Sequence, residues 1–335
     1  MTKPATTAAA KPVNTIQAVN AALDEAMGLD PSVICLGEDI GDEEEGGVVG
    51  VTRGLSTKYG RARVRTTPIS EQAIIGAAIG AAIVGMRPVA EIMLMNFTTV
   101  AMDMIVNHAA KLRFMSGGQT HVPLTIRTMT GAGFGTGGQH ADYLEAWFAH
   151  TAGIKVVAPS SPADAYGLML SCIFDDDPCL FIENMPTYWN PGPAPVPGER
   201  IPLGKASVLR AGSDVTVVSY SRIMNDCVAV ADKLAQEGIR VELIDLRTVS
   251  PLDIDTVLAS VARTRRVVIV HEAVRSFGVG AEVAARIGEA LFGQLQAPVR
   301  RLGASYCAVP FAKPLETAFV PTQAQIERTV RSVLT

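Results

Sequence analysis

The chain has 335 residues, of which 48% are hydrophobic and 19% are charged, and its formal net charge is −4. This composition supplies enough apolar surface for a folded core, so it excludes disorder over the whole chain, and the lack of a basic surplus argues against nucleic acid as the main partner. The mean hydropathy of +0.25 leaves two alternatives: a membrane protein, or a protein that buries more surface than a monomer of this size can.

The terminal and apolar segments argue against a membrane protein. The longest run of apolar and small residues, 73–86, is shorter than the roughly 20 residues that a membrane-spanning helix needs. Residues 1–11 are rich in Ala and Thr and lack the apolar centre of a signal peptide, so we expect a disordered arm over residues 1–13. Five scattered cysteines without CxxC spacing indicate reduced core thiols in a cytoplasmic protein.

Short β-branched runs alternate with longer helical patterns in the first half of the chain. Strands are expected at 32–36, 88–93, 122–127, 154–158 and 179–183. Helices are expected at 15–27, 71–84, 98–115, 142–150 and 162–174. Alternation of this kind is typical of a parallel sheet covered by helices on both faces, so the sequence predicts an α/β domain over residues 14–189.

A proline-rich segment separates this domain from a second one. Five prolines fall within residues 190–202, and such a segment can continue neither a helix nor a central strand. We therefore place a linker at 190–207 and a smaller parallel α/β domain at 208–335. Its strands are expected at 215–219, 240–244, 267–271 and 299–302, and its helices at 224–237, 253–262, 279–292 and 322–334.

The predicted helix at 71–84 has two unusual features. Residues 75–85 read IGAAIGAAIVG, which places Gly and Ala four residues apart on one face. A bare face of this kind either packs tightly on the sheet of its own chain or forms a seam between subunits. Glu71 begins the helix, where an acidic residue ordinarily complements the helix dipole. A buried carboxylate at this place could instead act as a proton relay with a raised pKa.

A glycine-rich segment, GAGFGTGGQH at 131–140, follows the strand at 122–127. Gly133, Gly135 and Gly138 match the GxGxxG spacing of dinucleotide loops, but no acidic residue for the ribose follows near 153–158. An NAD-dependent dehydrogenase is therefore disfavoured. A mobile loop that exposes its backbone and delivers His140 to a ligand explains the segment better.

The order of several motifs along the chain points to a known family. The chain carries GEDIG (37–41), RVRTTPISE (63–71), GMRPVAEIM (85–93), GGQH (137–140) and VVIVHEAVRSFGVGAE (267–282), with further matches between them. From about residue 14 to its C-terminus, the sequence resembles the beta subunit of the thiamine-diphosphate-dependent, decarboxylating component of 2-oxo acid dehydrogenase complexes. The pyruvate and acetoin dehydrogenase types are the most similar.

The resemblance implies a transketolase-like pyrimidine-binding domain, a transketolase-type C-terminal domain, and a heterotetramer of two alpha and two beta chains that share thiamine diphosphate. Glu71 matches the glutamate that hydrogen-bonds the aminopyrimidine ring nitrogen and so helps to remove the thiazolium proton. His140 matches the histidine that assists acyl transfer to the lipoyl group of an acyltransferase partner. The resemblance also implies that four residues line the cofactor site: Ile69, Met93, Phe97 and Gln139.

Metal binding is implied only in part. Family members hold the diphosphate through magnesium at a GDG motif followed by an asparagine, and this chain has no GDG. The alpha subunit is therefore expected to hold the magnesium and the diphosphate, unlike in single-chain relatives such as transketolase. Some relatives bind a structural potassium ion, mostly through main-chain oxygens. The matching positions here are Leu124, Cys172, Asp175 and Asp177.

One departure from the family pattern concerns the histidine loop. Relatives usually read QHSQS where residues 139–143 read QHADY. Asp142 could raise the pKa of the neighbouring His140, since a nearby negative charge favours the imidazolium. The departure bears on the substrate and the acyl acceptor more than on the cofactor.

The sequence thus predicts a beta subunit that works only with its alpha partner, cleaving a small 2-oxo acid such as pyruvate, or acetoin, and acylating a lipoyl group. One alternative is a branched-chain 2-oxo acid dehydrogenase beta subunit, which residues 170–172 and 178–179 resemble. Another is a non-catalytic subunit that only docks the complex through its C-terminal domain. The presence of Glu71 and His140 argues against this second alternative.

Overall fold

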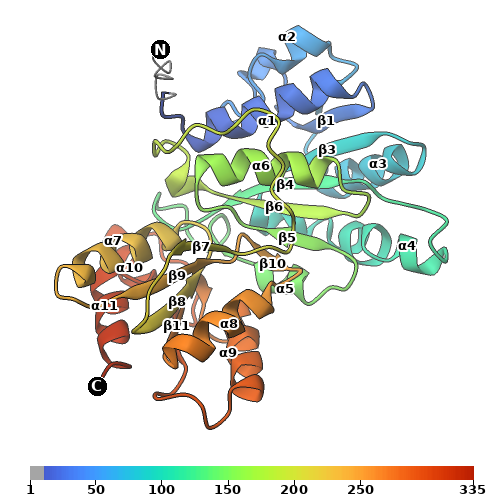
Figure 1. Cartoon of the computed structure of the whole chain (residues 1–335). Coiled ribbons are helices and arrows are strands. Elements are labelled where there is room, and N and C mark those ends of the chain that lie inside the picture. The colour runs from blue at the N-terminus through green and yellow to red at the C-terminus, as the bar shows by residue number, and fades with distance from the viewer. Residues whose placement is uncertain (1–10) are drawn as a thin grey trace, which may run out of the picture.

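The computed structural model of the chain describes residues 11–335, which form two α/β domains, each built on one sheet (Figure 1). The arm expected over 1–13 lies mostly outside the described residues. The first sheet has the strand order β10-β5-β6-β4-β3-β1-β2, and only β10 runs antiparallel to its neighbour. Its strands are β1 (Val33–Glu38), β2 (Val64–Thr67), β3 (Arg87–Leu94), β4 (Thr125–Thr130), β5 (Lys155–Val157), β6 (Cys179–Asn184) and β10 (Thr248–Ser250).

The helices of the first domain cover both faces of this sheet. They are α1 (Thr15–Leu29), α2 (Leu55–Tyr59), α3 (Glu71–Ile83), α4 (Leu112–Met115), α5 (Glu145–Ala149) and α6 (Pro162–Ile173), with short 3₁₀ turns η1 (Asp42–Glu44), η2 (Met95–Thr99) and η4 (Met185–Thr187) and a π-helix η3 (Met104–Ala109). Local sequence sets where the longer helices begin. Asn14 and Gln17 form a capping box at α1, and Ser161 caps α6 ahead of Pro162.

Alternating side chains along each strand divide the core of the first domain. In β6, Cys179 and Phe181 pack with α1 and α6, whereas Leu180 and Ile182 point into the core on the face of α3 and α5. This alternation follows from the two-residue period of a strand. Because both faces are covered, all six residues of β6 are buried.

The second domain is a five-stranded sheet of order β12-β11-β8-β9-β7, in which only β7 is antiparallel to its neighbour. Its elements are β7 (Ser207–Arg210), β8 (Val215–Ser219), α7 (Ile223–Ala235), β9 (Val241–Asp245), α8 (Ile254–Thr264), β11 (Val267–Val274), α9 (Val279–Ala290), β12 (Arg300–Ala304), α10 (Lys313–Phe319) and α11 (Gln323–Arg331). Residues of α7 and α11 pack on one face, and residues of α8 and α9 on the other.

The predicted fold class of two parallel α/β sheets is confirmed, with one antiparallel strand at an edge of each. The antiparallel strand β10 lies beyond the predicted linker at 190–207 but completes the first sheet, so this sheet draws on both halves of the chain. The continuous helix expected at 98–115 is wrong. The segment divides into η2, η3 and α4, and the Ala110 N–H donates to the Ile105 carbonyl in a wider π turn.

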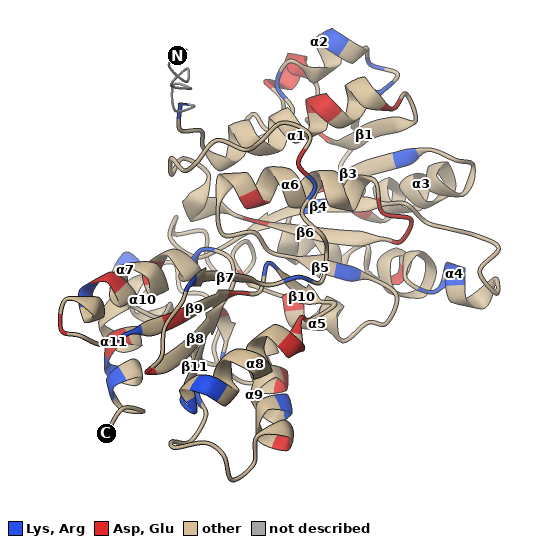
Figure 2. Cartoon of the chain, viewed as in Figure 1, with Lys and Arg blue, Asp and Glu red and all other residues tan. Residues whose placement is uncertain are grey.

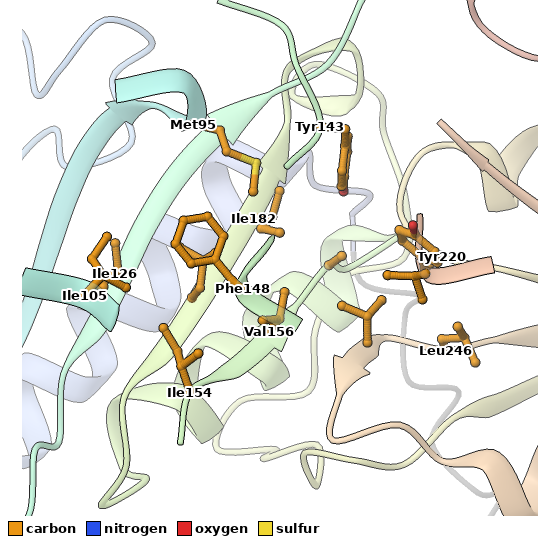
Figure 3. Close-up of a cluster of buried hydrophobic side chains, with 14 of the residues drawn as sticks. Met95, Ile105, Ile126, Tyr143, Phe148, Ile154, Val156, Ile182, Tyr220 and Leu246 are labelled. Carbon is orange, nitrogen blue, oxygen red and sulfur yellow. The ribbon is translucent and has the colours of Figure 1, made fainter. Parts of the chain in front are cut away.

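One apolar core runs through both domains. It joins residues of the first domain, such as Phe148 and Tyr143, to residues of the second, such as Tyr220 and Leu246 (Figure 3). The Tyr220 hydroxyl donates a hydrogen bond of 2.6 Å to Glu145 Oε1 across this junction. The two domains therefore share buried apolar surface as well as a polar contact, which favours a fixed relative placement.

Glu145 makes the stability of this junction depend on pH. The side chain is fully buried, and burial, with a smaller effect of Glu272, raises the pKa of its carboxyl group from 4.5 to about 7. Because the folded state holds the proton more tightly, stability should fall as pH rises from about 4.5 to about 7, by roughly 3 kcal/mol.

Glu145→Gln keeps the shape without the charge, so its thermal stability relative to the parent should increase between pH 5 and pH 8. The exposed Glu289→Gln serves as the control. A difference that stays constant with pH would contradict this account.

Charged side chains of both signs are spread over the two domains, whereas α3 carries no charge after its first residue (Figure 2). None of the helices formed by residues 11–335 has the length and apolarity that a membrane crossing requires.

Candidate active site

The predicted catalytic and cofactor-lining residues lie toward one edge of the first sheet. The neighbouring strands β4, β3, β1 and β2 are parallel, so their carboxyl ends lie at the same edge. Glu38 ends β1, Glu71 follows β2, Phe97 follows β3, and the glycine-rich loop at 131–140 follows β4. Ligands of open α/β sheets bind at this edge.

Glu71 is the first residue of α3 and is half-buried. The N-cap residue Ser70 makes no side-chain hydrogen bond to the helix, so the positive end of the helix dipole is left to the carboxylate of Glu71 or to a ligand. Ile74 and Ile75 are buried behind it and fix the first turn of the helix against the sheet. Ile69, two residues earlier, is 74% exposed and free to contact a ligand or another chain.

Glu38 is a further carboxylate at this edge that sequence reasoning did not identify. It ends β1 within the motif GEDIG, and the pKa of its carboxyl is raised by burial and then by the negative charges of Asp39 and Glu71. The two glutamates come from neighbouring parallel strands, since Glu38 ends β1 and Glu71 lies four residues after the end of β2. The only sequence signal was an acidic residue at the end of a buried strand.

Met93 and Phe97 form the apolar part of the site. Met93 lies in β3 and lines a small cavity with Met129 and the carboxylate residue Glu91. The rings of Phe97 and His140 meet edge to face, with centroids 5.5 Å apart and an interplanar angle of 73°. An aromatic face and a thioether provide a surface on which a flat heterocycle can pack.

His140 ends the glycine-rich loop, and its Nδ1 is buried without a hydrogen-bond partner. The loop is tied to η2, because the Asn96 side-chain amide donates to the Gly138 carbonyl at 3.1 Å and to Asp142 Oδ2 at 2.9 Å. Burial raises the pKa of the Asp142 carboxyl. Oδ2 of Asp142 is thus engaged by Asn96 and not by Nδ1 of the imidazole. Gln139 is exposed beside it.

A buried charged cluster lies across β3, β4 and β6, near the cavity that Met93 lines. Arg127 donates to Glu183 at 2.7 and 3.0 Å and also to Glu91, while the Tyr188 hydroxyl donates to Glu183 at 2.8 Å. Burial raises the pKa of Glu91 despite the nearby guanidinium. Sequence reasoning did not find this cluster, because its members are single polar residues in otherwise apolar strands.

The glycine-rich loop is not arranged as a dinucleotide site. The N–H groups of Gly133 and Gly135 already donate to Glu316 Oε1, at 2.6 and 3.0 Å. A phosphate would have to displace a carboxylate of the same chain from these donors. The GxGxxG spacing here therefore does not carry the function that it has in dinucleotide-binding proteins.

The residues that match the potassium positions contact cations of their own chain. The Lys155 ammonium donates to both oxygens of Asp175, at 2.5 and 2.6 Å, and Arg113 pairs with Asp177 at 2.7 Å. The carbonyls of Leu124 and Cys172 accept backbone N–H groups of residues 179 and 175, at 2.9 and 3.2 Å. Each of these carbonyls keeps a second lone pair, so potassium binding through the main-chain oxygens stays a prediction. Residues 11–335 also contain no group of three or more His, Cys, Asp or Glu placed to hold a metal.

Two family models match the chain. Residues 11–188 match "Transketolase, pyrimidine binding domain", and residues 204–326 match "Transketolase, C-terminal domain". Glu38, Glu71, Phe97 and the glycine-rich loop at 131–140 all lie within the first match. The sequence resemblance to this superfamily is therefore confirmed.

Curated relatives match over nearly the full chain. The beta subunit of acetoin:2,6-dichlorophenolindophenol oxidoreductase from Cupriavidus necator is 44% identical, over 95% of this chain and 96% of the relative. A mitochondrial pyruvate dehydrogenase E1 component subunit beta-2 from Oryza sativa subsp. japonica is 42% identical, over 97% of this chain and 87% of the relative. The pyruvate dehydrogenase E1 component subunit beta from Staphylococcus epidermidis is 42% identical, over 95% of this chain and 98% of the relative.

Solved structures share the fold at low sequence identity. The chain named "Split gene transketolase, inactive beta4 tetramer" has a TM-score of 0.79 at 21% identity, with 96% of this chain and 98% of that chain covered. The transketolase from Leishmania mexicana has a TM-score of 0.72 at 17% identity, covering 98% of this chain but 46% of that chain. In fold, this chain thus corresponds to about half of a single-chain transketolase.

Proposed function

Because the chain belongs to the family of transketolase-like beta subunits of pyruvate and acetoin dehydrogenases, we propose that it is the beta subunit of a thiamine-diphosphate-dependent dehydrogenase. Its substrate is a small 2-oxo acid of the pyruvate type or acetoin. The observation that carries this proposal is the convergence of Glu71, Phe97 and His140 at the carboxyl edge of the first sheet. A half-buried carboxylate, an aromatic ring and an imidazole with an unpartnered nitrogen fit an aminopyrimidine and a reacting acyl group.

Thiamine diphosphate, when bound, would supply a nucleophilic carbon for addition to the carbonyl carbon of the substrate. The residues of this chain would hold its pyrimidine half, with Phe97 and Met93 against the ring and Glu71 hydrogen-bonded to a ring nitrogen. The Glu71 carboxyl would hold or release a proton at this nitrogen, which is general acid–base catalysis. A second carboxyl, Glu38, ends the neighbouring strand β1 at the same edge, and the negative charge of Glu71 contributes to the raised pKa of its carboxyl group.

His140 would act on the acyl acceptor. An imidazole can give a proton to a sulfur of the lipoyl dithiolane as the ring opens, or stabilise the charge that develops there. Nδ1 of the imidazole is buried and has no hydrogen-bond partner within the described chain, so no group of this chain competes for its proton. Acylation of a lipoyl-bearing acyltransferase is therefore part of the proposal.

An alpha subunit would complete the site. The sequence has no GDG motif, so the alpha subunit would hold magnesium and the diphosphate. The small-residue face of α3 supports a subunit seam: Ala73, Ala77 and Gly80 are exposed, whereas Ile74, Ile75 and Ile79 are buried on the opposite side of the helix. We propose a tetramer of two alpha and two beta chains. Potassium binding and a cytoplasmic location stay predictions.

Substrate choice is tested by co-expressing the chain with its alpha subunit and measuring reduction of 2,6-dichlorophenolindophenol with pyruvate, acetoin and 3-methyl-2-oxobutanoate. We expect kcat/KM for pyruvate or acetoin to exceed that for the branched-chain acid by about 10-fold or more, a margin that a few methyl groups can provide. Preference for 3-methyl-2-oxobutanoate would favour the branched-chain alternative. If the assembled complex turns over none of the three, a non-catalytic assembly subunit becomes the better explanation.

A further inference from the structure

The loop that carries His140 is held by the C-terminal domain rather than by its own domain alone. Glu316 lies in α10 and is 1% exposed, and its Oε1 accepts the N–H groups of Gly133 and Gly135 at 2.6 and 3.0 Å. Lys313, one turn earlier in α10, donates to the Gly133 carbonyl at 2.8 Å. One helical turn of the second domain thus binds both the donors and an acceptor of the loop backbone.

A second carboxylate of the C-terminal domain holds the start of the same loop. Glu272 lies in β11 and is 4% exposed, and its Oε1 accepts the Ala132 N–H at 2.8 Å. Its Oε2 accepts the Asn184 side-chain amide at 2.8 Å and lies 3.3 Å from Arg222 Nε. Hydrogen bonds to a charged and buried acceptor are the strong ones, so Ala132 is firmly placed.

Apolar packing from the C-terminal domain follows the loop toward His140. Ala132 and Ala141 belong to the apolar core that α7 and α11 cover in the second domain. A Cβ built on Gly137 would lie 2.4 Å from the Phe311 ring, and one on Gly138 would lie 2.9 Å from Ala308 Cβ. Only glycine allows so close an approach, and the glycines at 131, 133, 135 and 137 have positive φ angles.

A loop with five glycines in ten residues has no strong conformational preference of its own, because each glycine adds backbone freedom in the unfolded chain. Its position must therefore come from the groups that bind it. The contacts of Glu316, Glu272 and Phe311 all come from the C-terminal domain, and they end within three residues of His140.

We propose that Glu316 is a positioning residue for His140: by binding the N–H groups of Gly133 and Gly135, it fixes the loop so that the imidazole meets the lipoyl acceptor. This inference rests on the proposed function for the chemistry of His140, but the anchoring itself does not. Glu316 does not touch the cofactor edge formed by Glu71 and Phe97, so it should affect acyl transfer and leave the earlier steps largely intact.

The test uses the assembled alpha–beta complex with Glu316→Ala and Glu316→Gln, and with the exposed Glu289→Ala as the matched control. Two assays are compared, acylation of a free lipoyl domain and reduction of 2,6-dichlorophenolindophenol, which bypasses the lipoyl step. Glu316→Ala should lower kcat for lipoyl acylation about 10- to 100-fold and change dye reduction less than about 2-fold, in line with misplacement of a catalytic group. Glu316→Gln, which keeps one acceptor oxygen, should give an intermediate loss.

A double variant separates positioning from general damage. If Glu316 acts through His140, His140→Ala combined with Glu316→Ala should acylate lipoyl domains no more slowly than His140→Ala alone. An additive loss would overturn the proposal, and so would an equal loss in both assays for Glu316→Ala or no loss in either.

Hydrogen exchange tests the anchor without relying on activity. Amides of residues 132–141 should exchange at least about 10-fold faster in Glu316→Gln than in the parent. Their exchange rates should be unchanged in Glu289→Ala. Unchanged exchange would overturn the proposal even if activity fell. If the parent complex is inactive in both assays, the proposed function fails, while the exchange result still decides whether Glu316 anchors the loop.

Discussion

Glu71→Gln should lower kcat of the assembled enzyme by about 10³-fold or more with every substrate that the parent turns over. The amide has the size of the carboxylate but cannot accept and return a proton at the pyrimidine nitrogen, and general acid–base catalysis contributes about 10²–10⁴ to such rates. Glu71 is half-buried at the start of α3, so the amide replacement should leave the fold intact. The measurement is steady-state dye reduction by the alpha–beta complex, with thermal unfolding monitored in parallel.

Gln72→Ala provides the matched control, because Gln72 is the next residue of the same helix and is exposed. It should retain activity within about 2-fold of the parent, as is usual for surface substitutions that remove no buried contact. Glu71→Gln with near-parental turnover would show that the carboxylate is a helix-dipole partner and not an acid–base group.

His140→Ala should separate the two halves of the reaction. We expect lipoyl acylation to fall about 10²- to 10³-fold, whereas dye reduction falls less than about 3-fold, because the imidazole serves the acceptor rather than the cleavage step. The relevant measurement is single-turnover acylation of a free lipoyl domain, compared with dye reduction on the same preparation.

His121→Ala is the appropriate control histidine. His121 is exposed and precedes β4, so it lies toward the amino end of the strand whose carboxyl end leads to His140. Its loss should leave both assays unchanged. If His140→Ala weakens both assays equally, the histidine positions the cofactor or the loop and does not act on the acyl acceptor.

Much of the fold followed from periodic patterns in the sequence. The run at 179–183 was expected as a buried strand, and β6 is buried along its whole length, because apolar residues at every position fit a sheet covered on both faces. The interrupted segment at 98–115 was not foreseen, since its composition suits a helix throughout. The choice between α and π turns there depends on tertiary packing around Ile105 and Ala109, which are buried.

The candidate site, like the fold, could be predicted from the sequence only in part. The resemblance to a known family named Glu71, Phe97 and His140, and the structure shows that each follows a strand at the same edge of one sheet. The contacts that hold these residues in place could not be predicted from the sequence. Glu316 is 183 residues from Gly133, and Glu272 is 140 residues from Ala132. No local pattern records such pairings, and a single glutamate in a short helix is in sequence no different from a solvated one.

The excess of apolar residues also gains an explanation in the structure. The mean hydropathy of +0.25 allowed either a membrane protein or a chain with a large interface. Val84, Phe114 and Met115 are at least 70% exposed, and they lie at the ends of α3 and α4, which both pack on η3. Apolar surface of this kind is typical of an interface that a partner covers.

The most direct test of the half-site account compares the purified chain alone with the chain assembled with its alpha subunit, at saturating thiamine diphosphate and magnesium. Dye reduction with pyruvate and acetoin should be undetectable for the chain alone and should appear on addition of the alpha subunit, reaching a constant rate at one alpha chain per beta chain. Comparable turnover by the chain without any alpha subunit would contradict the account, since the diphosphate half of the site would then have to lie within these 335 residues.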